Sequence, residues 1–523
     1  MVLKLQIEEG SPAASRARAI ASQLIACMAP NLLLLDLGMA ISFMTIALPD
    51  LLNASEGLSL NDREASWFSS ISFLTQPLGA VVSGPIVDYF GRKRSNFLVN
   101  IPIIFAWLLM YFSWNVLSLY AACALLGLSI GVMEAPINAY VGEISEPHLR
   151  GFLCTVTQFF TSVGMFLMFF LGTVVNWRQA ALICLAAPLA AMMLGLLVVP
   201  ESPVWLLVKG REKEALQALC KLRGWTTSEN VREEFDHLLE YSKQLQECPI
   251  CCAQNEKPKE CQHKNMNFFK RFVLKFKYVM LCKETLRPLG LTVFYFTFFV
   301  MSGLAPVRPN MVNVAEAMGM PLEGKTVVLL VGVITFVTTM AVIAFIKILG
   351  KRKIAISSLF GTAVCCLAMS IYCGSSLDPS VFSYDATTFP KEKSNVPMIL
   401  FFLMTMFTGF GIPWVLLGEV FPYRSRATSQ GLAAASNYVI TFLGSKTLID
   451  IESKFRLSGA WAVYAAFGFI GSVFLYFFQP ETEGKTLQEI ESYYSGKLRI
   501  FADDPIINSC KKLKSNQKTF DLE

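Results

Sequence analysis

Apolar stretches about twenty residues long recur along this chain and constrain its fold more than any other feature. A lipid bilayer offers the backbone no hydrogen-bond partners, so a chain crosses its core of about 30 Å as helices of about 20 apolar residues. We read twelve such stretches: 21–48, 66–87, 96–112, 116–142, 152–175, 179–199, 288–306, 325–349, 354–374, 396–418, 429–450 and 458–479. We therefore predict an all-α membrane protein with twelve transmembrane helices.

The composition excludes several other classes of protein. Hydrophobic residues make up 54% of the 523 residues and charged residues only 16%, whereas soluble domains average about 45–50% and about 25%. The 45 Lys and Arg residues are nearly balanced by 39 Asp and Glu residues, which excludes the concentrated basic charge of a nucleic-acid binder. We expect a lipid bilayer and a small solute as partners, no nucleic acid, and a monomer.

The placement of Lys and Arg in the short loops predicts the orientation. Cations gather at 92–94 and 351–353 and at Arg150, Arg424 and Arg426, and cytoplasmic loops carry an excess of such residues. This puts both termini and the polar block 200–286 in the cytoplasm. The sequon Asn53-Ala54-Ser55 then lies outside, where Asn53 is a candidate for glycosylation.

The two halves of the chain resemble each other. Gly91-Arg92 matches Gly350-Lys351, and Pro200-Glu201 matches Pro480-Glu481. Glu143 precedes Arg150 by seven residues, as Glu419 precedes Arg426. Such repeats indicate two six-helix bundles that rock around a site near the middle of the membrane. The predicted domains are a cytoplasmic segment 1–20, a bundle 21–199, a helical linker 200–286, a bundle 287–479 and a cytoplasmic tail 480–523.

Small and charged residues at the cytoplasmic helix ends are candidates for a gating network. Glycine permits tight turns, and Arg forms forked contacts with carboxylates. Several such ion pairs can hold the two halves together in one conformation and break in another. We assign Gly84, Asp88, Gly91, Arg92, Glu143, Arg150, Glu201, Glu419, Arg426 and Glu481 to this network. The simpler interpretation, that these cations only set the topology, stays open.

The motifs resemble those of the sugar porter family of the major facilitator superfamily. The resemblance rests on Ser83–Lys93, on Pro200–Arg211 and on Pro480–Leu487. Residues 65–68, 75–79 and 133–136 are most similar to the facilitated trehalose transporter-like branch. This resemblance implies facilitated movement of a sugar, such as trehalose or a hexose, across a plasma membrane by alternating access, with neither enzymatic activity nor a cofactor.

The resemblance also implies the substrate-binding residues. Gln158, Trp414 and Asn437 match the family's sugar-binding Gln, Trp and Asn, and Thr335 replaces an Asn. Amides donate and accept hydrogen bonds without a charge, and an indole covers an apolar sugar face. The segment 299–305, however, lacks both Gln residues and the Asn of the family pattern, so hexose specificity does not follow from the resemblance.

Ionisable residues inside the spans are further candidates. Asp36 matches the titrating Asp of proton-coupled relatives, but the position of its usual Arg partner is Cys123. Glu134 could face the substrate path, and we expect Lys446 to extend toward the membrane surface. A proton-coupled sugar or polyol symporter and a non-transporting sugar sensor therefore stay as alternatives. We predict no metal site, although Cys248, Cys251, Cys252 and Cys261 cluster in the linker.

Overall fold

The computed structural model describes residues 13–55, 57–246, 274, 280–422, 425–483 and 487–494. The side chains of Glu134 and Arg150 and the linker cysteines from Cys248 to Cys261 lie outside the described part. The described segments fold almost entirely into helices, with one isolated bridge between Leu52 and Leu60.

The N-terminal half contains six spans, as predicted. They are α1 (Ala13–Leu51), α2 (Asp62–Phe90), α3 (Arg92–Tyr111), α4 (Val116–Ile144), α5 (Pro147–Val174) and the consecutive helices α6 (Trp177–Cys184) and α7 (Ala186–Leu197). Side-chain caps fix several of these starts. Asn61, for example, accepts a hydrogen bond from the Glu64 backbone, whose side chain accepts one from Asn61 in return.

The C-terminal half repeats this plan with broken helices. It begins with α13 (Lys283–Val300), which is followed by α14 (Leu304–Val307), η3 (Arg308–Asn310) and α15 (Met311–Ala317). The chain bends by 53° between α13 and the segment that starts at Leu304. Gly303 supplies the break with a φ of 123°, a conformation that side chains disfavour. The seventh span is thus longer than the predicted 288–306.

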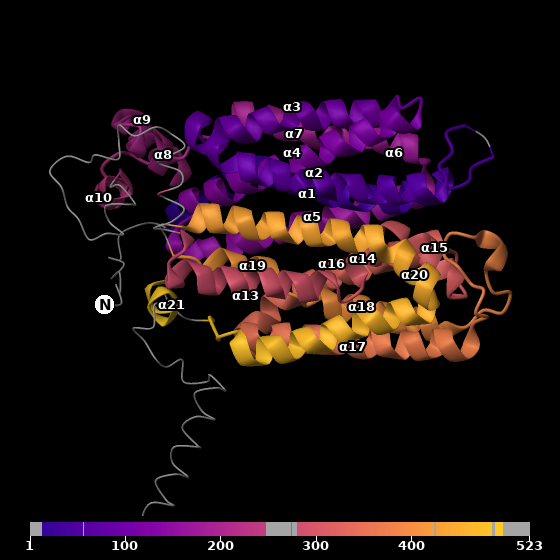
Figure 1. Cartoon of the computed structure of the whole chain (residues 1–523). Helices are drawn as coiled ribbons and strands as arrows, with labels where there is room; N and C mark the ends of the chain where they lie inside the picture. Colours follow the sequence, from indigo (N-terminus) through magenta and orange to yellow (C-terminus); the bar gives the residue numbers. More distant parts are fainter. Residues whose placement is uncertain are drawn as a thin grey trace, which may run out of the picture.

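The remaining spans are α16 (Gly324–Leu349), α17 (Lys351–Ser376), the pair α18 (Asn395–Gly409) and α19 (Pro413–Glu419), and α20 (Arg426–Phe478). A helix as long as α20 would measure about 80 Å, far beyond the thickness of a bilayer. Its backbone turns at Arg456, where φ is 62°, and Figure 1 shows the two arms doubling back. Ten helices and one bent pair are long and apolar enough to span a membrane, and with α20 counted twice they confirm the twelve predicted spans.

The two halves lie side by side (Figure 1). Contacts between them run along α2 and the first arm of α20, along α5 and α16, and between α1 and η3. These three pairs form most of the interface, and contacts of α1 with α15 and of α4 with α20 add to it.

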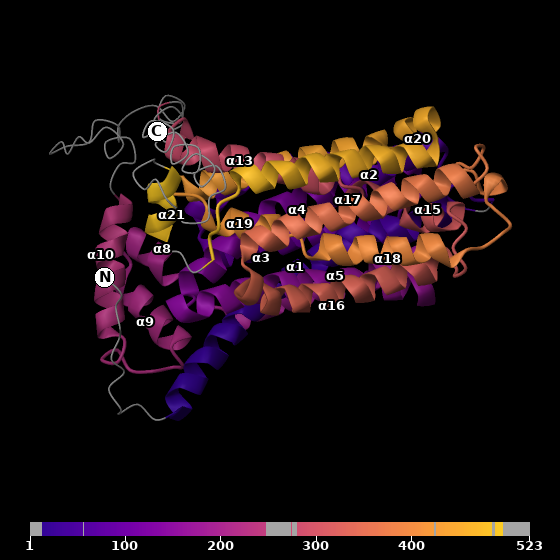
Figure 2. The same ribbon diagram turned by 90° about the horizontal axis from the view of Figure 1, so that it is seen from below.

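Short helices gather at one end of the bundles, here called the linker end. They are α8 (Pro203–Val208), α9 (Glu212–Leu222), α10 (Arg232–Gln246) and α21 (Leu487–Tyr494). The first three of these helices lie within the chain segment 200–286. Figure 2 shows the start of α1 reaching toward α9, where Ser22 donates a hydrogen bond to the Lys221 carbonyl. The opposite end, here called the far end, carries the loops 52–61 and 377–394.

Candidate functional site

Four side-chain hydrogen bonds or ion pairs join the halves within the described residues. Nearest the far end, Lys325 Nζ lies 2.9 Å from Asp50 Oδ1. Thr45 donates a 2.8 Å hydrogen bond to the Arg308 carbonyl, and Lys446 Nζ donates a 2.9 Å bond to Ser66 Oγ. The fourth contact, between the hydroxyls of Ser162 and Thr339, lies near mid-helix at 2.9 Å. Three of the four contacts thus hold the far end together.

Lys446 also lies over an aromatic ring of the other half. Its Nζ is 4.2 Å from the centre of the Trp67 ring, within the range of cation–π attraction. Phe442, one turn earlier on α20, lies 6.4 Å from the same ring. The ammonium of Lys446 thus bridges the two halves, and its extension toward the membrane surface stays a prediction.

Trp414 and Asn437 come from neighbouring helices of the C-terminal half. The helix is interrupted at 410–412, between α18 and α19. There the backbone N–H of Ile412 donates a hydrogen bond to the Tyr295 hydroxyl, and α19 begins at Pro413. Trp414 then packs edge-on against Phe296, 4.9 Å between ring centres, and lies 6.3 Å from Tyr438. Asn437 is buried beside Tyr438. Trp414 thus belongs to an aromatic group with Phe296 and Tyr438, and Asn437 precedes Tyr438 on α20.

Gln158 and Thr335 lie where α5 meets α16. The adjacent residues Phe159 and Phe336 contact each other across the interface, with ring centres 5.4 Å apart. Gln158 is exposed, and its amide makes no hydrogen bond with any described group. Thr335 donates its hydroxyl proton to the Val331 carbonyl within its own helix. Gln158 is therefore the freer of the two to bind a solute.

Asp36 lies inside the N-terminal bundle. It is fully buried, and its Oδ1 accepts a 2.9 Å hydrogen bond from the indole of Trp107 on α3. Its Oδ2 meets no donor among the described groups. The partner of Asp36 in this structure is therefore an indole. Glu134, the sixth candidate, lies outside the described side chains.

The linker end of the N-terminal half contains a compact ionic cluster. Gly91 has a φ of 93°, and a Cβ there would collide with the Glu201 carboxylate. Glu201 accepts bonds of 2.9 Å from the backbone nitrogens of Arg92 and Lys93. Arg92 in turn bonds Glu143 through two nitrogens, at 3.0 and 2.7 Å. The cluster ties the α2–α3 turn to the end of α4 and to the start of the linker.

The C-terminal half contains an equivalent cluster, in which each residue of the first cluster has a counterpart. Gly350 has a φ of 79° beside Glu481, which accepts bonds of 3.0 and 3.1 Å from the backbone nitrogens of Lys351 and Arg352. Lys351 Nζ lies 2.7 Å from both oxygens of Glu419. The internal repeat read from the sequence is therefore present in three dimensions.

Some of the expected roles in the gating network need correction. The contacts described for Glu143, Glu201, Glu419 and Glu481 all stay within their own half, so they do not bolt the halves together in this conformation. The cation of Glu419 is Lys351, whereas Arg426 donates to the Phe421 carbonyl.

Two other members of the network make few contacts. Asp88 is exposed and lies 3.8 Å from Arg92. A Cβ on Gly84 would meet no atom within 4 Å, so the close packing expected there is missing. Arg150 lies outside the described side chains.

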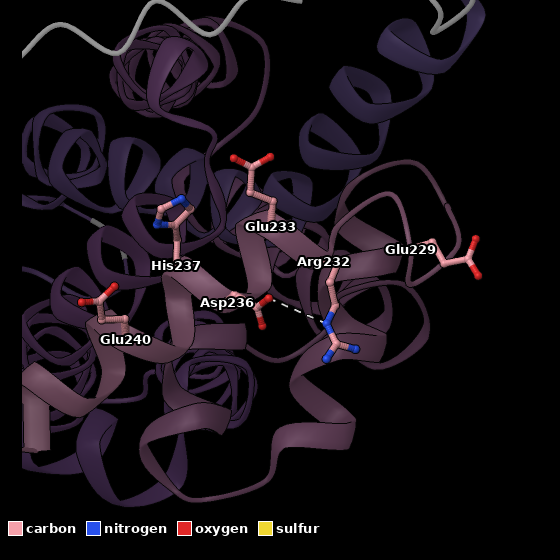
Figure 3. A pocket seen from close by; sticks show the side chains of 6 residues that line it. All are labelled: Glu229, Arg232, Glu233, Asp236, His237 and Glu240. Carbon is pink, nitrogen blue, oxygen red and sulfur yellow. Dashed lines mark ion pairs between the residues drawn. The ribbon is translucent and has the colours of Figure 1, made fainter. Parts of the chain in front are cut away.

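The linker helices contact the N-terminal half. Arg223 of the linker lies 3.2 Å from Glu146 at the start of α5 and also pairs with Glu234 of α10. Figure 3 shows an open hollow along α10, with an Arg232–Asp236 pair at 3.8 Å. It is lined by Glu229, Arg232, Glu233, Asp236, His237 and Glu240. All six come from α10 or the turn before it, so this hollow is not part of the interface between the bundles. Asn53 is exposed at the far end.

Sequence reasoning missed Asp50, Lys325 and Trp67. Each lies near a span end, where charged and aromatic residues are ordinary, so no local pattern distinguishes them. Lys351 could have been found, because it follows Gly350 as Arg92 follows Gly91.

Comparison with known proteins identifies the family. Residues 24–494 match the family described as "Sugar (and other) transporter". A facilitated trehalose transporter Tret1 of Polypedilum vanderplanki is 28% identical over 92% of this chain and 89% of its own length. The Tret1 of Drosophila virilis is 27% identical over 91% of this chain, which spans only 49% of that protein.

Solved structures confirm the predicted fold. The proton:xylose symporter XylE bound to 6-bromo-6-deoxy-D-glucose superposes with a TM-score of 0.66 at 18% identity, over 91% of this chain and 99% of its own. A partially occluded inward-open structure of XylE from E. coli gives the same score and identity. At this identity the match establishes the architecture alone. The relatives are transporters rather than enzymes, and the chain belongs to the sugar transporter family, with the fold of the major facilitator superfamily.

Proposed function

We propose that this protein is a uniporter that moves a saccharide or polyol down its gradient by alternating access. The observation that carries the proposal is the interface itself, where three helix pairs from two repeated bundles meet and polar contacts concentrate at the far end. In a transporter whose conformations differ little in free energy, such contacts break and form as the bundles rock. The named relatives, which are facilitated trehalose transporters, support trehalose as one candidate, and hexoses are further candidates.

We further propose that the linker end faces the cytoplasm and that the membrane is the plasma membrane. The Lys and Arg residues after α2 and α16 favour this orientation. The far end is then the outer face, and the contacts at Asp50–Lys325 and Ser66–Lys446 close the outside in this conformation.

In this proposal Gln158, Trp414 and Asn437 bind the solute when the bundles enclose it. Gln158 offers an unbonded amide from one half, and Trp414 offers an indole from the other. Their chemistry suits hydroxyl groups and an apolar ring face.

Uptake into proteoliposomes tests the function. Purified protein is reconstituted, and entry of labelled trehalose, glucose and sorbitol is followed with and without a protonophore. Uniport predicts saturable uptake that the protonophore leaves unchanged. Absence of saturable uptake for every labelled saccharide and polyol overturns the proposal.

Proton coupling is the second candidate, favoured by the buried carboxyl of Asp36. It predicts that the protonophore abolishes accumulation against a gradient. The hydrogen bond from Trp107 gives Asp36 a structural role instead, which favours uniport. Binding of a saccharide without uptake would identify a sensor.

A further inference from the structure

A cation lies in the interface of the two halves and has no acidic partner among the residues that the structure describes. Arg308 occupies η3, between the broken ends of the seventh span, and is half-buried. Its carbonyl accepts the hydrogen bond from Thr45 of α1. Thr45 precedes the end of α1 at Leu51 by six residues, or about 9 Å of helix. The backbone of Arg308 therefore lies against α1, about two turns before the end of that helix.

Three acids on the surrounding elements make contacts with other groups. Asp50, on the same helix as Thr45, pairs with Lys325. Asp36, deeper on α1, is bonded to Trp107. Glu452 of α20 accepts two bonds from Ser383. No carboxylate of the described residues comes within 4.0 Å of Arg308.

Uncharged acceptors do not compensate for this cation either. Within the described part of the chain, the Arg308 side chain donates no hydrogen bond. Burying an unpaired charge is costly, and ionisable residues inside a membrane generally serve the passage of a solute or ion. A guanidinium binds carboxylate and phosphate through two parallel hydrogen bonds, which a neutral hydroxyl cannot match.

The neighbouring sequence favours an anion over a neutral sugar. The segment 299–305, just before Arg308, contains no Asn or Gln. Two amides follow Arg308, and the oxygen of the first, Asn310, already accepts a hydrogen bond from Tyr384. Ser42, one turn deeper than Thr45 on α1, has a buried hydroxyl with no described partner. The bend at Gly303 places η3 directly against α1.

We propose that Arg308 is the anion-binding residue of the transport path and that the solute is a saccharide carrying a carboxylate or a phosphate group. The proposal rests on the proposed function and narrows its substrate class. As the bundles rock, the interface between α1 and η3 opens, and the guanidinium meets the anionic group of the solute.

Binding and uptake together test this proposal. Purified full-length protein is assayed with glucuronate, glucose 6-phosphate and glucose, first by the shift in melting temperature and then by uptake into proteoliposomes. We expect one of the two anionic saccharides to bind at least tenfold more tightly than glucose, and the comparison of the two distinguishes carboxylate from phosphate. Arg308→Gln should lose at least tenfold in affinity for that anion while its affinity for glucose changes less than twofold. Arg308→Lys should restore part of the loss.

Lys454→Gln is the matched control, because it removes a cation from an exposed position near the turn of α20. It should bind and transport like the wild type. Equal affinity of the wild type for glucose and both anions overturns the proposal but leaves saccharide transport intact. An equal loss for glucose and anion in Arg308→Gln also overturns it, since that result assigns Arg308 to closure of the interface. Failure of every saccharide to enter, with tight anion binding retained, overturns the proposed function alone.

Discussion

Lys446 of the C-terminal half lies over the ring of Trp67 in the N-terminal half, 4.2 Å from its centre, and donates a hydrogen bond to Ser66 beside it. One side chain thus makes two contacts across the interface, both near the far end. These contacts form only while the far ends of α2 and α20 are together.

Lys446→Gln should shift the protein toward conformations that are open at the far end. Loss of a cation–π contact worth about 1 kcal/mol changes a two-state population about fivefold. Spin labels at Ser59→Cys and Thr387→Cys, in far-end loops of opposite halves, report the separation by pulsed electron resonance. Longer distances should gain population in Lys446→Gln but not in Lys454→Gln. Identical distance distributions would show that Lys446 does not hold this end closed.

Glu201→Ala and Glu481→Ala should each lower the melting temperature. Each carboxylate accepts three backbone hydrogen bonds, at 2.9 to 3.1 Å, and charged hydrogen bonds contribute about 1.5–3 kcal/mol. We expect a loss of about 2 kcal/mol in either variant. Glu212→Ala, at an exposed position that starts α9, should melt like the wild type. A melting temperature for Glu201→Ala equal to that control would contradict the structural role.

Asp36→Asn should preserve stability and uptake, because the amide oxygen can still accept the proton of Trp107 Nε1. Trp107→Phe leaves the buried carboxyl without its donor and should cost about 1–3 kcal/mol. Thermal unfolding and uptake with a protonophore measure both effects. Loss of uptake in a folded Asp36→Asn protein would instead assign Asp36 to proton coupling.

Gln158→Ala and Trp414→Ala should weaken uptake while surface expression stays near the wild-type level. Each removes a proposed solute contact worth about 1 kcal/mol or more, so the half-saturating concentration should rise about fivefold or more. Trp114→Ala is the control, since Trp114 is an exposed Trp at the opposite end of α3 from the linker. Normal uptake by both test variants would mean that the solute binds elsewhere.

Asn53→Gln should abolish glycosylation in cells that glycosylate. The residue is exposed in the loop after α1, and the proposed orientation puts that loop outside. Ser55→Ala should have the same effect, because it also destroys the sequon. Gel mobility before and after treatment with a glycosidase measures the result. Unchanged mobility of the wild type on treatment would count against an outside location of this loop.

The sequence predicted the spans well because lipid imposes one simple rule on every helix. The exception is the seventh span, which continues to Ala317 although Arg308, Asn310 and Asn313 lower its hydropathy. These residues occur where η3 and α15 contact protein rather than lipid, so an apolar window could not detect them. Asn310, for example, accepts a hydrogen bond from Tyr384 of the 377–394 loop.

Prediction of the site was less complete. Trp414 lies against Tyr438, the residue after Asn437, whereas Asp36 is directed to Trp107. Cross-bundle partners such as Asp50 and Lys325 are 275 residues apart in the chain, and no periodicity links them. Their pairing depends on how two bundles dock.

The hairpin form of α20 has a mechanical consequence. Its first arm meets α2 of the other half, and its second arm packs on α17 and α13, where Phe469 contacts Phe360 and Phe474 contacts Phe294. The turn at Arg456 is one residue long, too short to absorb sliding between the arms. A displacement of α2 is therefore transmitted through both arms of α20 to α17 and α13. The C-terminal bundle then tilts as a rigid body, and its helices do not slide past one another.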